Sequence, residues 1–485
     1  MNVKYVFRIT ALCVFVTSVF MLAPAIIAII DSQIKNAFIY FGLVAVTMIS
    51  SGLVFLLTRN YKPTFYAQEG FAATSISWII MSFLGAIPFK LTGEIPSYID
   101  ALFEIVSGFT TTGASILTDV EALSRCNLYW RSFSHWLGGM GVLVFLLAIV
   151  PTAKKEGGSG IFLMRAESPG PSVGKFTPHI RQTAIILYVI YILLTAACVI
   201  LLLVGGMPVF DSLCIAFGTA GTGGFAVLNS SMASYSVFCR GVVTVFMFLF
   251  GVNFNIYFLI LLRQFKSVFK NGELRTYILI VLSSIALITL NIRSMFGNIG
   301  DALHHAAFQV SSIMTTTGFA SVDFEQWPAF SKSILFILMF IGACAGSTGG
   351  GLKVSRIILL FKSIWKTIIK TLHPRKVHIV RMDSKTVEAS VTHGVNSYLA
   401  IYCVIILTSF LIVSLDNYTI GTNLSAVVAC FNNIGPGFEL VGATANYAHF
   451  SDLSKIVLSC DMLLGRLEIF PLLVLFSPDL WSRKR

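Results

Sequence analysis

Residues 103–113 read FEIVSGFTTTG, and residues 308–318 read FQVSSIMTTTG. The two segments share a leading Phe, an acid or its amide, a Ser and the whole TTTG ending. Related Gly-containing endings occur twice more, as AGTG at 220–223 and as IGPG at 434–437. The chain therefore contains an internal fourfold repeat, and such a repeat has to be recognised before any fold is assigned.

Long apolar segments flank each of the four Gly-containing loops. Of the 485 residues, 56% are hydrophobic and only 12% are charged, which is about half the charged fraction of a soluble domain. Runs of about 20 apolar residues cross a bilayer, so the composition excludes a soluble globular protein. Ten segments are predicted to span a membrane: 6–30, 37–58, 69–90, 132–152, 183–205, 238–262, 276–293, 331–372, 396–416 and 453–476.

The segment 331–372 is too long for one plain span, and it contains the Gly-rich sequence GACAGSTGGG at 342–351. Glycine weakens a helix and permits several backbone conformations, so we expect two half-helices joined by a non-helical insert at membrane depth. A nucleotide-binding P-loop is the rival interpretation. Its pattern GxxxxGK[ST] is not met, because Leu352 separates Gly351 from Lys353.

A shorter apolar stretch precedes each Gly-containing loop. At about 12 residues it is too short to cross, so each is predicted to enter the membrane and return on the same side. Irregular backbone at that depth must be buried in protein or line water. Four loops meeting at one axis satisfy this condition, because their carbonyl oxygens can replace an ion's hydration shell. The C-terminal ends of the short helices would favour a cation.

The expected fold is an all-α integral membrane protein with ten spanning helices and four re-entrant pore helices. They form pseudo-fourfold helix–pore-loop–helix repeats around one pore. Helix packing by small residues is the alternative explanation of the Gly and Thr residues, but it does not explain four copies at matching places. The predicted regions are two leading helices at 1–66, pore unit 1 at 67–155, pore unit 2 at 180–270, pore unit 3 with the broken helix and gate loop at 273–376, and pore unit 4 at 390–485.

The candidate filter residues come from the four loops, with Gly113, Gly223, Gly318 and Gly437 as matching anchors. The full predicted filter is Thr110, Thr111, Thr112, Gly113, Ala220, Gly221, Thr222, Gly223, Thr315, Thr316, Thr317, Gly318, Ile434, Gly435, Pro436 and Gly437. The second loop lacks the Thr pair, and Pro436 precedes the anchor of the fourth. We therefore predict a less symmetric filter with weaker discrimination against sodium.

A gate is predicted in the Gly-rich insert and beneath the filter. Its candidate residues are Gly346, Ser347, Thr348, Gly349, Gly350, Gly351, Lys353 and Arg466. An Arg in mid-membrane costs at least ~2.5 kcal/mol and marks a functional position. We expect Arg466 to face the pore, contact the gate loop in the closed state and repel resting cations. The alternative is that Arg466 forms a structural ion pair. Glu468, two residues later on the helix, points away from Arg466, so the partner would have to be another carboxylate, and this possibility stays open.

The net charge of +12 follows the membrane topology rather than a nucleic-acid partner. Most basic clusters can face the cytoplasm together, which also places both termini there. Lys362, Lys366 and Lys370 form one basic helical face that suits a partner protein or anionic lipid. The nine Cys are scattered without a CxxC pair, so we expect neither disulfides nor a structural metal site. Acidic residues that follow the loops either concentrate cations or keep the loops soluble; they are Asp119, Glu121, Asp323, Glu325 and Glu439.

Five further motifs, together with the loops, carry a resemblance over essentially the whole chain. They read WLGGMG at 136–141, RAESPGP at 165–171, AGSTGGGLK at 345–353, HPR at 373–375 and GRLEIF at 465–470. In these motifs the chain resembles the Trk/Ktr/HKT superfamily of potassium transporters. It is most similar to the bacterial TrkH branch, whose members have two extra leading helices.

The resemblance implies potassium uptake through a four-loop filter, with an intramembrane loop that blocks the pore and moves to open it. In the plant branch a Ser at the first filter position accompanies sodium transport, so Gly113 favours potassium. The resemblance also implies a homodimer, a cytoplasmic ring of TrkA-type regulatory subunits that bind nucleotides, and the bacterial inner membrane. Potassium is then a transported ligand, and no resident cofactor is expected.

Two other functions stay open at the level of sequence. Uptake coupled to proton or sodium symport is the first, since the residues do not distinguish a channel from a coupled carrier. An intramembrane enzyme acting on lipid is the second, but it would need a nucleophile–base pair or a metal cluster at membrane depth. No such constellation is apparent in the sequence, so we do not expect an enzyme.

Overall fold

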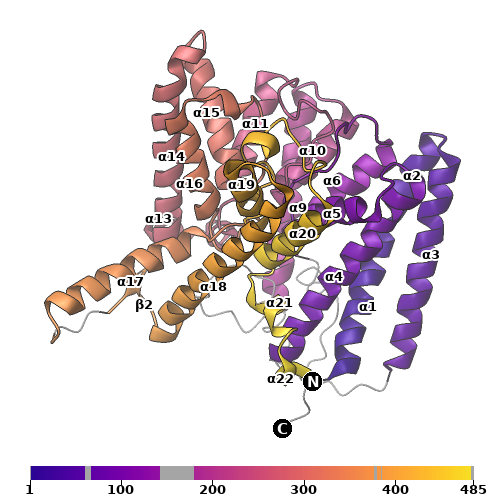
Figure 1. Cartoon of the computed structure of the whole chain (residues 1–485), viewed down its shortest axis with the longest axis horizontal. Helices are drawn as coiled ribbons and strands as arrows, with labels where there is room; N and C mark the ends of the chain where they lie inside the picture. The colour runs from indigo at the N-terminus through magenta and orange to yellow at the C-terminus, as the bar shows by residue number, and fades with distance from the viewer. Residues whose placement is uncertain (1, 60–66, 142–179, 376–378, 384, 482–485) are drawn as a thin grey trace.

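The computed structural model describes residues 2–59, 67–141, 180–375, 379–383 and 385–481. Helices make up most of these residues (Figure 1). The second half of the predicted span 132–152 and the motif at 165–171 lie outside the described residues.

Two leading spans pack beside the first repeat. α1 (Val3–Phe20) and α2 (Leu22–Ile30) form one span that is interrupted at Met21, and α3 (Ile34–Leu57) returns antiparallel to it. Pro24 explains the interruption, because proline has no N–H and its ring clashes with the carbonyl four residues earlier.

The remaining helices follow the predicted repeat. Repeat 1 contains α4 (Ala67–Thr92), α5 (Tyr98–Phe109) and α6 (Arg125–Gly139). Repeat 2 contains α9 (Ile180–Val204), α10 (Val209–Gly221), α11 (Val237–Phe250), α12 (Phe254–Leu261) and α13 (Phe265–Lys270). Repeat 3 contains α14 (Gly272–Ile292), η1 (Arg293–Met295), α15 (Ile299–Met314), η2 (Phe324–Gln326), α16 (Ala329–Ile341) and α17 (Val354–Leu372). Repeat 4 contains α18 (Ala389–Val413), η3 (Ser414–Asp416), α19 (Ile420–Phe431), η4 (Glu439–Val441), α20 (Asp452–Arg466), α21 (Phe470–Val474) and α22 (Pro478–Trp481).

A small hairpin connects the third and fourth repeats. Strands β1 (Arg381–Met382) and β2 (Lys385–Thr386) pair antiparallel, with Arg381 opposite Thr386. The hairpin lies near the base of α17, which extends away from the helical body at the lower left of Figure 1.

Six helices of the described residues are long and apolar enough to cross a membrane, and a seventh span results if α11 and α12 are joined despite an 88° bend. The segment 331–372 is indeed two helices separated by a non-helical insert, as predicted. The last predicted span, 453–476, is also broken, because α20 ends at Arg466 and α21 begins only at Phe470. The prediction of one continuous helix there was wrong.

Short helices precede all four Gly-containing loops. Side-chain caps start three of them: Ser97, Asn298 and Thr419 each accept a hydrogen bond from the backbone N–H three residues later. The fourth, α10, begins after Pro208. Each short helix packs against the second long helix of the preceding repeat, in the pairs α10–α6, α15–α11, α19–α16 and α5–α20. The last pair closes the circle, so the four repeats surround one axis near the centre of Figure 1.

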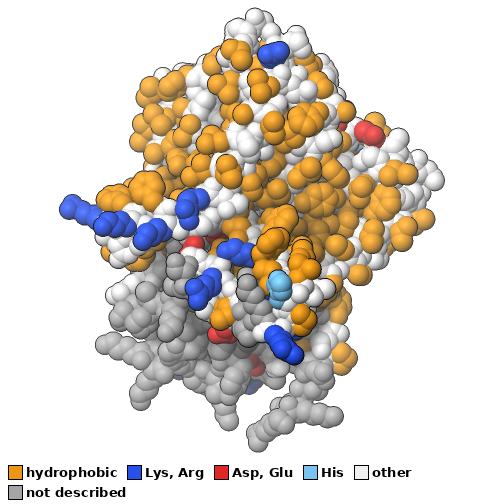
Figure 2. All heavy atoms as spheres, turned by 90° about the vertical axis from the view of Figure 1, so that its left-hand side faces the viewer, with side chains coloured by type: hydrophobic (Ala, Val, Ile, Leu, Met, Phe, Trp, Pro, Cys, Tyr) orange, Lys and Arg blue, Asp and Glu red, His pale blue; other side chains and the backbone are white. Residues whose placement is uncertain are grey.

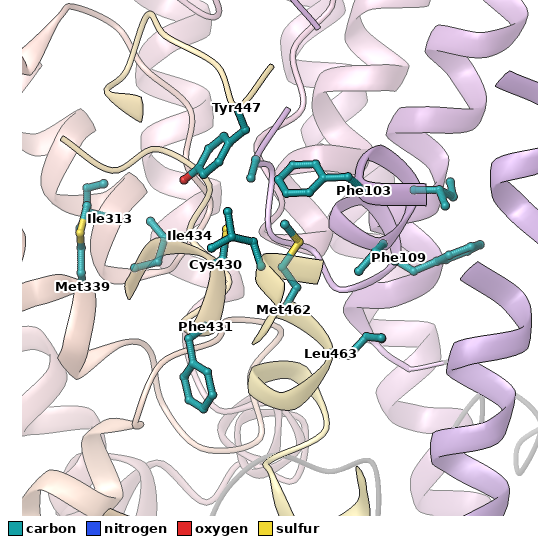
Figure 3. Packing of buried hydrophobic residues seen from close by; sticks show 14 of the residues in the cluster. Phe103, Phe109, Ile313, Met339, Cys430, Phe431, Ile434, Tyr447, Met462 and Leu463 are labelled. Atoms are coloured by element: carbon teal, nitrogen blue, oxygen red, sulfur yellow. The ribbon is translucent and has the colours of Figure 1, made fainter. Parts of the chain in front are cut away.

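Buried aromatic and sulfur-containing side chains hold the repeats together near this axis. In Figure 3, Phe103 and Phe109 of repeat 1 lie beside Met462 and Tyr447 of repeat 4. The rings of Phe103 and Tyr447 are 5.5 Å apart. Tyr447 also donates a hydrogen bond from its hydroxyl to the Gly435 carbonyl at 2.7 Å, which anchors one of the loops.

The outer surface is unusually apolar. Figure 2 shows hydrophobic side chains over the upper part of one face, with Lys and Arg gathered below them. Residues such as Phe38, Ile49 and Leu279 expose about 70% of their surface, at 73%, 72% and 68%. Apolar area on this scale requires a covering phase, and a lipid bilayer supplies it.

Candidate ion-binding site

The four short helices end in the same way. A backbone N–H just beyond each helix bonds to a carbonyl five residues earlier, at 2.8 or 2.9 Å. The pairs are Thr112 with Ser107, Gly223 with Gly218, Thr317 with Ser312, and Ile434 with Ala429. The residue before each donor has a positive φ of 55–59°, at Thr111, Thr222, Thr316 and Asn433. Three Thr residues in this region are costly, so the shared conformation is imposed by the surroundings.

A glycine with positive φ follows each donor. These glycines are Gly113, Gly224, Gly318 and Gly435, with φ of 83°, 74°, 84° and 95°. The anchors that we predicted in the second and fourth loops, Gly223 and Gly437, are therefore wrong by one and two residues. Both loops contain neighbouring glycines, and the sequence does not show which of them takes the strained conformation. With the correct register, Pro436 follows its glycine and does not precede it.

The four glycines define a closed ring of backbone contacts. A Cβ atom added to Gly113 would clash with the carbonyl oxygen of Gly223, and one on Gly224 would clash with that of Thr317. The same holds for Gly318 against the Ile434 oxygen. A Cβ on Gly435 would lie 2.7 Å from the Thr112 oxygen. The contacts run from loop 1 to loop 2, from loop 2 to loop 3, from loop 3 to loop 4, and from loop 4 back to loop 1. At each of the four positions the carbonyl oxygen of the next loop leaves no room for a side chain, so only glycine fits.

Hydroxyl groups tie loops 1 and 3 to their helices. Thr110 Oγ1 donates to the Val106 carbonyl at 2.7 Å and lies 2.8 Å from Thr112 Oγ1. Thr315 and Thr317 repeat this pair at 2.8 Å in loop 3. Loop 4 differs, because there an amide replaces the hydroxyls.

The amide of loop 4 is that of Asn433. Its Nδ2 donates to Thr112 Oγ1 at 3.0 Å and to the Met462 carbonyl at 2.9 Å. Asn433 thus connects loops 1 and 4 directly. The predicted filter did not include Asn432 and Asn433, although they occupy the positions of the first two Thr residues of TTTG. The ring is consequently less regular than a fourfold TTTG ring.

A buried ion pair lies behind loops 1 and 2. Arg131 Nε is 2.6 Å from Glu104 Oε1, and the two side chains are only 3% and 0% exposed. Arg131 also donates to the Ala226 carbonyl at 3.0 Å and stacks 3.5 Å from the ring centre of Phe225. Glu104 accepts from the N–H of Ile116 at 2.9 Å. Through these bonds the ion pair connects the segment after loop 1, at Ile116, with the segment after loop 2, at Ala226.

His135, one turn after Arg131 on α6, supports the same junction. Its Nδ1 lies 2.8 Å from the Gly108 carbonyl, and its Nε2 accepts from the Phe225 N–H at 3.3 Å. A neutral imidazole with its proton on Nδ1 satisfies both bonds. The sequence repeat pointed to Glu104 through its match with Gln309, but nothing in the sequence singled out Arg131 or His135.

Replacing Arg131 by Met is expected to lower the free energy of unfolding by about 3–5 kcal/mol, because Glu104 would stay buried without its cation. The matched control is Lys332→Met, which removes a cation from the more exposed pair with Glu325 (33% and 22% exposed) and should cost less than about 1 kcal/mol. Unfolding by a denaturing detergent in mixed micelles measures both. Equal losses of unfolding free energy in the two variants would show that the buried ion pair contributes no more to stability than the exposed one.

The second long helix is interrupted below the ring in repeats 2, 3 and 4, and in repeat 1 α6 ends there. α6 ends at Gly139, α11 and α12 are separated by residues 251–253, α16 and α17 by 342–353, and α20 and α21 by 467–469. The sequence predicted only the interruption in repeat 3, which is long and Gly-rich. The one in repeat 4 depends on Glu468 and Ile469, which take positive φ of 58° and 65° without being glycine.

The Gly-rich insert lies directly against the ring. The N–H of Gly350 donates to Thr316 Oγ1 at 2.6 Å, and the N–H of Gly351 donates to the Asn432 carbonyl at 3.1 Å. A Cβ on Gly349 would lie 2.7 Å from the Thr315 oxygen. The insert therefore contacts loops 3 and 4 through positions where no side chain fits.

Several bonds fix the lower part of the insert. The hydroxyl of Thr348 donates to the Phe250 carbonyl at 3.2 Å, and the Gly346 carbonyl accepts from the Phe254 N–H at 3.0 Å. Lys353 is 1% exposed, and its ammonium group bonds to the Gly349 carbonyl. Ser347 is likewise buried. Lys353 thus lies inside the insert and not at a water-filled vestibule.

Arg466 bridges three repeats below the ring. Its Nη1 donates to the Thr348 carbonyl at 2.8 Å, and its Nη2 donates to the Gly139 carbonyl at 2.7 Å and to that of Gly138. Arg466 belongs to repeat 4, Thr348 to repeat 3 and the two glycines to repeat 1. Glu468 pairs instead with Arg356. Arg466 therefore contacts the Gly-rich insert, and among the ion pairs of the described residues there is none between Arg466 and Glu468.

Two carboxylates at the outer ends of the loops are held in the ionised form. A hydrogen bond from Asn229 lowers the pKa of Asp119 below its ordinary value. The hydroxyls of Thr419 and Thr422 do the same for the pKa of Glu439. Both groups therefore carry charge at neutral pH, and negative charge near an entrance raises the local concentration of cations.

Comparison with known proteins agrees with this geometry. The TrkH family model, described as a cation transport protein, matches residues 34–483. The chain belongs to the TrkH family. It is 35% identical to the Trk system potassium uptake protein TrkH of Salmonella typhimurium, over 99% of this chain and 100% of that protein. It is 32% identical to TrkG of Escherichia coli, with the same coverage.

A solved member of the TrkH family has the same fold. The crystal structure of the potassium transporter TrkH from Vibrio parahaemolyticus superposes with a TM-score of 0.88 and 31% identity, over 99% of this chain and 100% of that one. Membership in the TrkH family makes this chain a membrane cation transporter and not an enzyme. The sequence-based assignment to the TrkH branch is confirmed.

Proposed function

We propose that this chain takes up potassium through the ring formed by residues 110–113, 221–224, 315–318 and 432–435. The observation that carries the proposal is the cyclic contact of Gly113, Gly224, Gly318 and Gly435 with the backbone of the next loop. A ring of backbone carbonyls can replace the hydration shell of a potassium ion. The relatives named as potassium uptake proteins supply the choice of ion.

The membrane arrangement is part of the proposal. The chain would have ten spanning helices and four re-entrant pore helices in the bacterial inner membrane, in the regions 1–66, 67–155, 180–270, 273–376 and 390–485. Both termini would be cytoplasmic. In support, α1 begins and α22 ends at the same end of the molecule (Figure 1), as an even number of spans requires.

The Gly-rich insert would be the gate, and the conformation described here would be its closed form. The insert contacts loops 3 and 4, and Arg466 joins it to repeat 1 across the space below the ring. The charge of Arg466 at that place repels a cation leaving the filter. Opening requires the Thr348–Arg466 bond to break and the insert to withdraw.

Regulation would come from outside the chain. The resemblance noted above favours a homodimer and a cytoplasmic TrkA-type ring that binds nucleotides. The basic face of α17 is formed by Lys362 and Lys370, which are exposed, and by the half-buried Lys366. It suits either such a ring or anionic lipid. No nucleic-acid partner is proposed.

Coupling to a proton or sodium ion is the second candidate. One observation favours a proton: Asp461 on α20 is 2% exposed, and its carboxyl accepts only from Ser409 Oγ, at 2.7 Å, among the described residues. A membrane potential alone supplies ~2.3 kcal/mol per 100 mV for one charge. Coupling is therefore not needed on energetic grounds, and we favour uptake driven by the potential.

A flux assay in proteoliposomes tests both candidates. With an inside-negative membrane potential imposed by a gradient of another ion, we expect the purified chain to carry potassium faster than sodium. An imposed proton gradient without a potential should drive no uptake. Equal rates for potassium and sodium would overturn the potassium proposal, and uptake driven by the proton gradient alone would favour the symport.

A further inference from the structure

A basic cavity lies at the base of α17, outside the ring and the insert. Its volume is about 390 Å³. It is formed by the end of α13, the start of α14, α17 and the β1–β2 hairpin. The polar side chains that line it are Lys270, Arg275, Thr276, Lys362, Arg381 and Asp383.

Positive charge dominates the cavity. Its one carboxylate, Asp383, already accepts from the Gly272 N–H at 2.7 Å and from the Asn271 side chain at 3.4 Å. Among the residues that the structure describes, the Lys362 ammonium donates to one backbone carbonyl, that of Arg381, at 2.7 Å. Within the described ranges none of the four cations forms an ion pair with a carboxylate. Four cations around one cavity repel one another unless an anion lies between them.

The surroundings of the cavity indicate where it lies relative to the membrane. α17 exposes a row of large apolar side chains, namely Phe361, Ile364, Trp365, Ile368 and Leu372, beside its exposed lysines. Helices with this pattern lie in the membrane interface, with the apolar side towards the acyl chains. Figure 2 shows Lys and Arg side chains gathered below the apolar surface on this side of the molecule. The cavity is thus at the level of lipid headgroups.

Two helices that line the cavity, α14 and α17, are also connected to the Gly-rich insert. Glu273, in the first turn of α14 between Lys270 and Arg275, accepts the N–H of Ala345 at 2.7 Å. On the other side, α17 begins directly after the insert and carries Lys362. A ligand that bridges Lys270, Arg275 and Lys362 would therefore connect the start of α14, which contacts the insert, with α17, which follows it.

We propose that this cavity binds a phosphate group and that its occupancy changes the opening of the Gly-rich insert. Phosphate oxygens match clustered Lys and Arg, and basic pockets between helices on the cytoplasmic side hold anionic headgroups. The exposed apolar side of α17 favours the headgroup of an anionic lipid over a soluble phosphate. The effect on opening rests on the proposed function, whereas the binding does not.

Binding to the purified full chain tests the site directly. Titration calorimetry in a neutral detergent would use a short-chain phosphatidylglycerol and, separately, inorganic phosphate. Each basic residue near an anionic group contributes about fivefold in affinity. The double variant Lys270→Gln, Arg275→Gln should thus lose roughly 25-fold in affinity. The control Arg263→Gln, Lys266→Gln removes the same charge from exposed positions that do not line the cavity, and it should lose less than about threefold.

The two probes distinguish the sources of the phosphate. Tighter binding of phosphatidylglycerol supports a lipid ligand, and binding of inorganic phosphate alone supports a soluble one. Equal losses in the cavity and control variants, or no binding of either probe, would overturn the site.

A flux measurement tests the link to the insert. In phosphatidylcholine vesicles, adding phosphatidylglycerol should change potassium flux at least about twofold for the wild type and the control, but not for the cavity variant. Binding without a change in flux would overturn the coupling and leave the site intact. Absence of flux in every vesicle would instead count against potassium uptake itself.

Discussion

Gly435→Ala is expected to reduce potassium flux by at least about tenfold, whereas Gly437→Ala should keep most of it. Gly435 has a φ of 95°, and an added Cβ would lie 2.7 Å from the Thr112 carbonyl oxygen. A left-handed conformation costs an alanine roughly 1–2 kcal/mol, and 1.4 kcal/mol already corresponds to tenfold. The strain falls on a backbone that is proposed to contact the ion.

Gly437 is a matched control two residues away. It is not among the residues with positive φ. Its added Cβ would meet the side-chain atoms Val441 Cγ2 at 2.8 Å and Ser425 Oγ at 2.9 Å, and its nearest backbone atom would be the Ser425 carbonyl carbon at 3.1 Å. Side-chain ends can shift where a backbone carbonyl cannot. Potassium flux in proteoliposomes, normalised to the amount of inserted protein, measures both variants. Loss of flux in Gly437→Ala with normal flux in Gly435→Ala would restore the register that the sequence suggested.

The second large effect is expected at Arg466. Arg466→Ala removes the bonds to the Thr348 and Gly139 carbonyls and a positive charge below the ring. Hydrogen bonds of a charged group are worth about 1.5–3 kcal/mol each, so even one of them shifts a closed–open equilibrium about tenfold. Basal potassium flux without any partner protein should rise by at least that factor.

Arg466→Lys separates the two contributions. It keeps the charge but not the planar group that reaches repeats 1 and 3 together. If bridging keeps the gate closed, the lysine variant should leak nearly as much as the alanine variant. If repulsion dominates, it should stay closed. Unchanged flux in both variants, with normal insertion in the membrane, would remove Arg466 from the gate.

The repeat and the main interruption were predictable because composition determines them. Four Gly-containing loops at matching places and a run of small residues at 342–351 leave few alternatives for a chain this apolar. The TTTG loops also gave the correct glycine, since each contains only one. In loops 2 and 4 the sequence did not give the correct glycine. Each of these loops has two candidates, Gly223 and Gly224 or Gly435 and Gly437, and only the backbone of the neighbouring loop shows which of them takes the positive φ.

Tertiary contacts account for what the sequence did not show. Arg131 and His135 appear as ordinary residues of a helix, and only the approach of loop 2 gives them partners. The interruption at 467–469 has a local signal that the sequence analysis missed: Pro471, in the first turn of α21, has no N–H to bond the Leu467 carbonyl. The interruption is maintained by the surroundings of Glu468, whose carboxylate pairs with Arg356 on α17.

Ion density at the ring tests the central claim most directly. A structure determined with thallium or rubidium in place of potassium should show a peak on the axis enclosed by loops 110–113, 221–224, 315–318 and 432–435. The backbone oxygens of Thr112, Gly223, Thr317 and Ile434 should be among its ligands. Absence of density on this axis, in a preparation that carries the same ion in a flux assay, would contradict the account.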